Sequence, residues 1–164
     1  MPDRENNDSL AKLGREGSVV VETGSREETF ELGRQFGEAS RAGEIYILTG
    51  DLGAGKTVFA QGFAWGLGIT EPVNSPTFTI LQIYEGGRLP LCHFDVYRIA
   101  DVGEMEETGY EDYFYGDGVC LIEWANLIEE ILPESCIRIE MIRKPERGFD
   151  SREITVSRGA GGRK

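Results

Sequence analysis

Residues 50–57 have the types and spacing of a phosphate-binding loop, G-x-x-x-x-G-K-[ST]. Glycines let such a loop curl so that its backbone N–H groups converge on an anion, and the following helix N-terminus adds partial positive charge. In this pattern Lys56 reaches the β- and γ-phosphates, and the Thr57 hydroxyl ligates Mg²⁺. The run predicts a nucleoside triphosphate site made by Asp51, Leu52, Gly53, Ala54, Gly55, Lys56, Thr57 and Val58.

The sequence on either side of the loop predicts the strand and the helix that must position it. Residues 45–48 are a β-branched and aromatic run, which is typical of a buried parallel strand. Phe59, Phe63 and Leu67 recur every fourth residue and give a helix with one strongly apolar face. We therefore expect Lys56 in an exposed loop between a buried strand and a helix.

Two carboxylates at the ends of apolar runs could complete the site. Asp95 follows the run 91–94, and Glu123 follows the run 119–122. A site of this kind needs an acidic residue at the end of a neighbouring buried strand, to hold Mg²⁺ directly or through water. Because the second run is the more continuously apolar, we assign Glu123 to the metal and Asp95 to positioning or deprotonating the attacking water. Either could instead be an ordinary strand-end carboxylate.

The remaining patterns predict a P-loop NTPase-like α/β sandwich, with a mixed, partly antiparallel central sheet flanked by helices. Residues 1–17 are polar and aperiodic and are expected to be disordered, residues 18–157 to form a single ATPase domain, and residues 158–164 to be a flexible tail. A capping box of Ser25 and Glu28 begins a helix whose buried stripe is Leu32, Phe36 and Ala39. The other expected elements are strands 18–23, 77–84, 89–95, 136–142 and 153–157, short helices within 101–117, and a helix over 125–132.

Composition limits the classes of function. The 29 acidic against 17 basic residues give a net charge of -12, which disfavours direct, tight binding to nucleic acid. No stretch is apolar enough to span a membrane and no signal-peptide core is present, so a cytoplasmic protein is expected. The three cysteines match neither a zinc site nor a redox pair, and the single histidine, His93, is interpreted as a strand residue rather than an acid or base.

In the order in which they occur, residues 50–57, 75–78 (SPTF), 93–98 (HFDVYR) and 122–124 (IEW) resemble the bacterial TsaE (YjeE) family. That family is the small ATPase of the machinery that places threonylcarbamoyl on the tRNA adenosine next to the anticodon. The resemblance implies ATP and Mg²⁺ as cofactors, Lys56 and Thr57 on phosphate and metal, Glu123 as the metal contact and Asp95 in hydrolysis. It also implies Trp124 beside the nucleotide, Thr77 in a switch-like loop, and docking on the TsaB and TsaD proteins, with tRNA reached only indirectly.

Other readings stay open. Val58 stands where the family often has a second threonine, which should matter little because Thr57 supplies the hydroxyl. A small-molecule kinase would need lid arginines, and the only basic residues between Thr57 and Ile137 are Arg88 and Arg98. A GTP-dependent switch would need an N-K-x-D element, which the chain lacks. A nucleotide-binding scaffold without useful turnover is the remaining alternative.

The segment 101–117 interleaves carboxylates with Tyr110, Tyr113, Phe114 and Tyr115. Such a mixture suits an interface with a basic partner, because aromatic rings contribute burial and charges steer the encounter. The rings could equally face the protein's own core.

Overall fold

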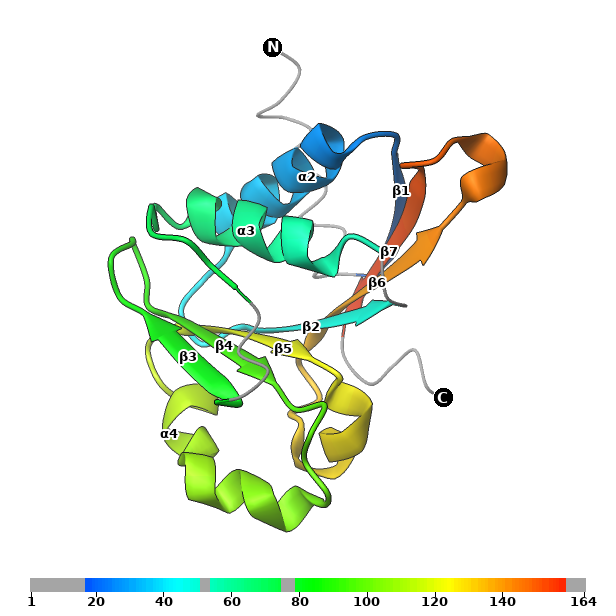
Figure 1. Cartoon of the computed structure of the whole chain (residues 1–164). Helices are drawn as coiled ribbons and strands as arrows, with labels where there is room; N and C mark the ends of the chain where they lie inside the picture. The colour runs from blue at the N-terminus through cyan, green and yellow to red at the C-terminus, as the bar shows by residue number, and fades with distance from the viewer. Residues whose placement is uncertain (1–16, 51–53, 75–78, 159–164) are drawn as a thin grey trace.

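The computed structural model describes residues 17–50, 54–74 and 79–158, and its strands form one seven-stranded sheet in the order β1-β7-β6-β2-β5-β4-β3 (Figure 1). The central strands β6, β2, β5 and β4 run parallel, whereas β1, β7 and β3 pair antiparallel at the two edges. This confirms the predicted mixed sheet. The strands are β1 (Ser18–Thr23), β2 (Ile45–Gly50), β3 (Leu81–Tyr84), β4 (Leu91–Asp95), β5 (Val119–Glu123), β6 (Ile137–Arg143) and β7 (Arg152–Arg158).

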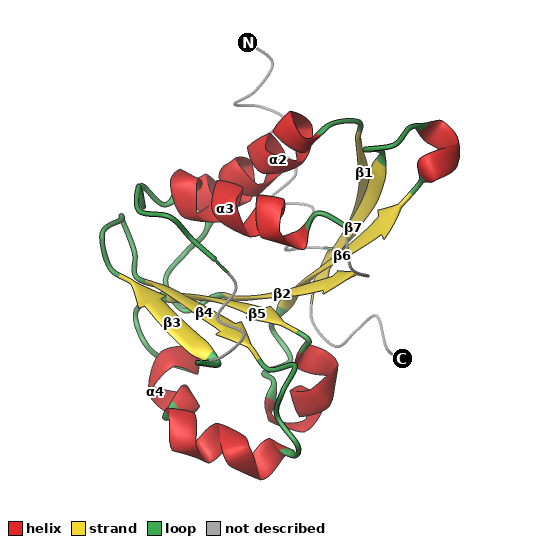
Figure 2. Ribbon diagram, in the orientation of Figure 1, coloured by secondary structure: helices red, strands yellow, loops and turns green. Residues whose placement is uncertain are grey.

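Helices cover both faces of the sheet (Figures 1 and 2). One face carries α2 (Arg26–Ala39) and α3 (Lys56–Gly66), and the other carries the 3₁₀ helices η1 (Val102–Thr108) and η2 (Ala125–Ile131) with α4 (Tyr110–Phe114) between them. Strand β2 shows why: Tyr46 and Leu48 join the core under α2 and α3, whereas Ile45 and Ile47 join the opposite core. A third 3₁₀ turn, η3 (Pro145–Arg147), lies in the connection between β6 and β7.

Helix α2 begins at the predicted cap, and an arginine from a distant loop donates hydrogen bonds to its C-terminal end. The Glu28 N–H donates to Ser25 Oγ at 3.1 Å, and Glu28 Oε1 accepts from the Gly24 N–H at 2.6 Å. At the other end, Arg88 Nη2 donates to the carbonyl oxygens of Gly37, Glu38 and Ser40 at 2.9–3.1 Å. Arg88 therefore adds donors to the carbonyls at the C-terminal end of α2, where Ser40 already donates to the Gly37 carbonyl, and this is a structural role.

Helices α2 and α3 touch through glycines. A Cβ atom built on Gly33 or Gly37 would overlap the backbone of Phe59 or Phe63, and one built on Gly62 or Gly66 would overlap the backbone of Phe30 or Arg34. The two backbones can approach this closely only because all four positions lack a side chain. The apolar face predicted for α3 is confirmed, since Phe59, Phe63 and Leu67 are buried.

Two local predictions needed adjustment, and the burial of the rings in the segment 101–117 can now be described. In the described part of the segment 77–84 the strand begins only at Leu81, because Ile80 has a positive φ of 68° that interrupts extended backbone. The helix expected over 125–132 is a 3₁₀ helix. Phe114 is buried and Tyr110 and Tyr113 are partly buried against the core beneath them, so Tyr115, 67% exposed, is the most accessible of the four rings.

Candidate functional site

A pocket of about 820 Å³ lies where the carboxyl ends of the parallel strands meet the N-terminus of α3. This is where ligands bind in open α/β sheets, and the volume is in the usual range for a ligand site. It is lined by Arg26, Thr29, Gly55, Lys56, Thr57, Val58, Gln61, Asp95, Tyr97, Glu123, Trp124, Arg143, Phe149, Asp150 and Arg152.

The end of the glycine-rich loop forms the floor of this pocket. Gly55 caps α3 with a left-handed backbone (φ 99°, ψ 15°), a conformation that glycine adopts without steric cost. Thr57 is exposed in the first turn of the helix and lines the pocket. Ala54 is buried behind them, and its carbonyl accepts a hydrogen bond from Arg152 Nε at 2.9 Å.

Lys56 departs from the sequence-based expectation of an exposed lysine. It is only 9% exposed, and its Nζ lies 4.3 Å from the centroid of the Trp124 ring. A buried ammonium needs a compensating partner, which the negative face of an indole supplies. The structure thus brings together Lys56 and Trp124, which are 68 positions apart in the sequence, and places the ammonium in the pocket at the N-terminus of α3.

Asp95 and Glu123 end neighbouring parallel strands and are direct partners in the β4–β5 register. Both are 4% exposed. The predicted central position of β5 is confirmed, because β5 pairs directly with β2, the strand that leads into the loop. Asp95 Oδ1 accepts the backbone N–H of Tyr97 at 3.0 Å, which fixes the carboxylate at the strand end.

His93 is a buried strand residue, as expected, but its contact with Glu123 was not foreseen from the sequence. Its Nε2 lies 2.7 Å from Glu123 Oε2, and its side chain is 1% exposed. Its Nδ1 has no hydrogen-bond partner among the described residues. His93 and Asp95 are two positions apart on one strand and so lie on the same face of the sheet. This spacing is the sequence feature that could have indicated that His93 lies near the carboxylates. The ring therefore orients the carboxylate assigned to the metal.

Backbone strain is concentrated beside these groups. Trp124, directly after Glu123, has a left-handed backbone (φ 65°, ψ 32°), which is uncommon for a bulky residue. Its ring packs on Tyr97 with centroids 4.7 Å apart. Ile80, the other non-glycine with positive φ in the described residues, accepts the Asp95 N–H through its carbonyl at 2.8 Å. Both strained residues thus contact the carboxylate pair or its strand ends.

Three further arginines line the pocket, which sequence analysis did not foresee. Arg26 comes from the start of α2, Arg143 from the end of β6 and Arg152 from the start of β7. All three lie outside the interval between Thr57 and Ile137, so counting basic residues there missed them. Because these arginines line the pocket, a lack of basic residues no longer argues against transfer of phosphate to an acceptor.

Some predicted residues cannot be placed. Asp51, Leu52, Gly53 and Thr77 lie outside the described residues. The structure brings Gly55, Lys56, Thr57, Val58, Asp95, Glu123 and Trp124 to the same pocket. Ala54, also predicted to bind the nucleotide, is buried and its side chain is not part of the pocket lining.

The donor set at the carboxylate end fits Mg²⁺. Magnesium takes hard oxygen ligands and usually combines one or two carboxylates with phosphate oxygens and water. Glu123, Asp95 and the Thr57 hydroxyl are oxygen donors that line one pocket. Within the described ranges, no three His, Cys, Asp or Glu side chains gather into a metal site of their own.

The cysteines stand apart from the site. Cys92, Cys120 and Cys136 are buried in the core below the sheet and form no disulfide. Burial raises the pKa of the Cys136 thiol to about 11, so it stays protonated and unreactive at neutral pH. The interpretation of the cysteines as small buried residues is confirmed.

A parallel sheet core, a glycine-rich loop between β2 and α3, and carboxylates at the ends of the adjacent strands define an α/β protein with the architecture of P-loop nucleotide-binding folds. The family model described as threonylcarbamoyl adenosine biosynthesis protein TsaE matches residues 23–154. The chain therefore belongs to the TsaE family.

Individual relatives agree with this assignment. The tRNA threonylcarbamoyladenosine biosynthesis protein TsaE of Bacillus subtilis is 52% identical over 131 residues, 80% of each chain. The protein of the same name from Treponema pallidum is 43% identical over 81% of this chain and 96% of its own. A crystal structure of Bacillus subtilis YdiB superimposes with a TM-score of 0.73 and 43% identity, over 88% of each chain.

Proposed function

We propose that the protein binds and hydrolyses ATP with Mg²⁺, and that this activity supports threonylcarbamoyl modification of tRNA through the TsaB and TsaD proteins. The observation that carries the proposal is the convergence of Lys56, Asp95 and Glu123 on one pocket at the N-terminus of α3. Family membership and the pathway named in its description supply the biological context. No helix among the described residues is long and apolar enough to cross a membrane, and we assign the activity to the cytoplasm.

Each residue has a separable role in this proposal. Lys56 and the N-terminal amides of α3 hold the phosphates. Their positive charge stabilises the transition state, in which the transferred phosphoryl group is only loosely bonded to the attacking and leaving oxygens. Asp95 orients a water for in-line attack on the γ-phosphorus and takes its proton as the bond to the bridging oxygen breaks. Glu123 and Thr57 would hold Mg²⁺, which would supply positive charge to stabilise the phosphates.

Phosphate release measured alone and with purified TsaB and TsaD tests the proposal directly. We expect slow Mg²⁺-dependent release by the protein alone and association with the two partners that depends on nucleotide. Lys56→Ala should abolish release while circular dichroism stays unchanged. Normal hydrolysis by Lys56→Ala would refute the site, and tight ATP binding without turnover under any partner condition would identify a scaffold.

A phosphate transferase is the second candidate, favoured by Arg26, Arg143 and Arg152 in the pocket. Such side chains are what a kinase uses to bind an anionic acceptor. ATP consumption that depends on a small-molecule acceptor and yields no free phosphate would support it over hydrolysis.

A further inference from the structure

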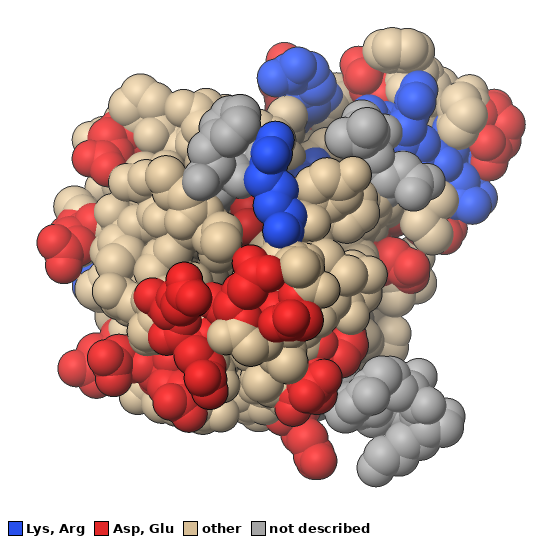
Figure 3. All heavy atoms as spheres, turned by 60° about the horizontal axis from the view of Figure 1, so that its bottom comes forward, with Lys and Arg blue, Asp and Glu red and all other residues tan. Residues whose placement is uncertain are grey.

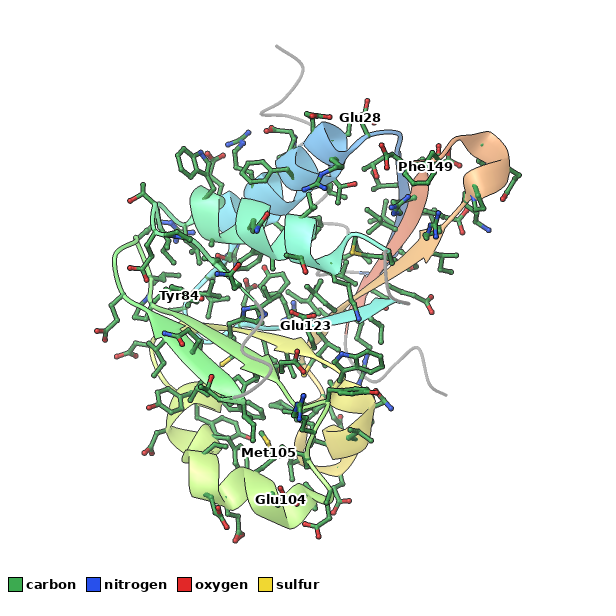
Figure 4. All side chains as sticks on the ribbon, in the orientation of Figure 1. Glu28, Tyr84, Glu104, Met105, Glu123 and Phe149 are labelled. Atoms are coloured by element: carbon green, nitrogen blue, oxygen red, sulfur yellow. The ribbon has the colours of Figure 1, made fainter. Side chains whose placement is uncertain are left out.

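The pocket has two chemically different ends on either side of the α3 N-terminus. One end carries Asp95, Glu123 and Trp124, from β4, β5 and the turn after β5. The other end carries Arg143, Phe149 and Asp150, from the end of β6 and the β6–β7 connection. In Figure 4, Glu123 lies on the β5 side and Phe149 on the side of the β6–β7 connection.

This arrangement gives a bound nucleotide a direction. If the phosphates occupy the α3 N-terminus and the γ-phosphate faces the carboxylates, the sugar and base must extend towards the opposite end of the pocket. The sheet order supports the same direction, because β5 and β6 flank β2 on opposite sides.

Phe149 is the large apolar side chain at that opposite end. It is 79% exposed, the highest value among the exposed large hydrophobic residues described. The guanidinium carbon of Arg143 lies 5.7 Å from its ring centroid. An exposed ring that lines a pocket offers a face on which a planar ligand group can stack.

The segment that carries Phe149 is tied directly to the phosphate loop. Arg152 donates from Nη1 to the Phe149 carbonyl at 3.2 Å and from Nε to the Ala54 carbonyl at 2.9 Å. The same connection is held to the sheet by the ion pairs of Arg147 with Glu22 and Glu153. One arginine thus links the backbone of the segment that carries the ring to the backbone of the loop.

We propose that Phe149 is the stacking platform for the base of the nucleoside triphosphate, with Arg152 as the residue that positions it. The inference rests on the proposed nucleotide-binding function and adds the location of the base. Because stacking uses the π-face common to all bases, the platform contributes affinity without choosing between adenine and guanine.

The pocket contains one other aromatic candidate, the pair Tyr97 and Trp124, which lies at the carboxylate end. The Trp124 face is already occupied by the Lys56 ammonium at 4.3 Å. A base placed there would also put the triphosphate's γ-end away from Asp95 and Glu123. We therefore favour Phe149.

Binding of ATP, GTP and inorganic tripolyphosphate to Phe149→Ala and Phe149→Trp, measured by calorimetry, separates base from phosphate recognition. We expect Phe149→Ala to weaken ATP and GTP by about tenfold each, the loss typical of one stacked base, and to leave tripolyphosphate unchanged. Phe149→Trp should retain wild-type affinity for both nucleotides. Tyr115→Ala, an exposed aromatic residue absent from the pocket lining, is the matched control and should change none of the three.

Several results would overturn the platform. Unchanged ATP affinity in Phe149→Ala, or an equal loss of ATP and tripolyphosphate, would exclude stacking by this ring. A loss of nucleotide affinity in Tyr97→Ala without one in Phe149→Ala would place the base at the carboxylate end. If the wild-type protein binds tripolyphosphate as tightly as ATP, the base contributes no affinity and the platform is overturned, but the proposed function is not. If the wild-type protein binds neither ligand, the proposed function is overturned as well.

Discussion

Asp95 and Glu123 occupy equivalent places at the ends of adjacent strands, yet their contacts differ. Asp95 accepts a backbone N–H of the turn that follows it, whereas Glu123 is paired with a buried histidine ring. A carboxylate fixed by backbone can present a constant geometry to a water molecule, and one oriented by a histidine resembles the outer-shell arrangement of metal ligands. These contacts support the division of roles that we propose.

For Asp95→Asn we expect preserved ATP affinity and hydrolysis slowed by roughly a hundredfold or more, because an amide cannot accept the proton of water. Asparagine keeps the oxygen that accepts the Tyr97 N–H, so the strand end stays intact. Single-turnover hydrolysis and equilibrium binding measure the two quantities separately. A fall in affinity with an unchanged rate at saturation would make Asp95 a binding residue.

For His93→Leu we expect the Mg²⁺-dependent part of nucleotide affinity to fall by about tenfold, the lower end of the loss usual for a group that orients a metal ligand. His93→Gln, which can place an amide donor near the former Nε2, should restore part of it. Affinity measured in EDTA should be the same in all three proteins. Equal losses in Leu and Gln variants, with and without Mg²⁺, would indicate a purely structural histidine.

The position of the proposed phosphate site depends on how α3 lies against α2. The four glycines let the two helix backbones come into contact, and the α3 N-terminus is the floor of the pocket. Arg88 and the Ser25 cap hold the two ends of α2. The helix pair therefore forms a rigid support on which the loop residues are presented.

Gly37→Ala should destabilise the protein although alanine favours helix by about 1 kcal/mol over glycine. The new Cβ would overlap the Phe63 backbone, and overpacking of this kind costs about 1–3 kcal/mol. We expect a net fall of several degrees in Tm, since about 1 kcal/mol corresponds to 2–4 °C at this chain length.

Gly86→Ala is the matched control, because a Cβ there meets nothing within 4 Å. Differential scanning calorimetry should show its Tm unchanged. A higher Tm in Gly37→Ala would mean that helix propensity outweighs the close contact and that the two helices can separate at little cost.

Over the whole molecule, charge is unevenly distributed. Asp and Glu cover much of the face shown in Figure 3, while Lys and Arg gather towards its upper part. The acidic residues of η1, α4 and their flanks are mostly exposed, including Glu106, Glu107, Glu111 and Asp112. With a net charge of -12, this surface repels a polyanion and suits a basic protein partner better.

We therefore expect the free protein to bind tRNA weakly and with strong salt dependence. Binding to nucleic acid gains affinity by releasing counterions, which requires clustered Lys and Arg. Filter binding of labelled tRNA from low to physiological salt measures this, with TsaB and TsaD added in a parallel series. Tight binding by the free protein that salt does not weaken would contradict an indirect role towards tRNA.

The local sequence pattern was sufficient to predict the strand–loop–helix unit and the carboxylates at the ends of two strands. Residues 45–48 and the spacing of Phe59, Phe63 and Leu67 identify β2 and α3 because periodicity reports which face is buried. The pairing of β5 with β2 followed from the continuous apolar run before Glu123, which only a strand covered on both faces can carry.

Tertiary structure alone decided which distant side chains share the pocket. Arg152 reaches Ala54 across 98 residues, and Phe149 and Arg143 enter because β6 lies next to β2 and β7 folds back beside it. His93 meets Glu123 through the register of two parallel strands. Periodicity fixes which face of an element is buried but carries no information on which elements become neighbours, since pairing depends on the packing of the whole sheet.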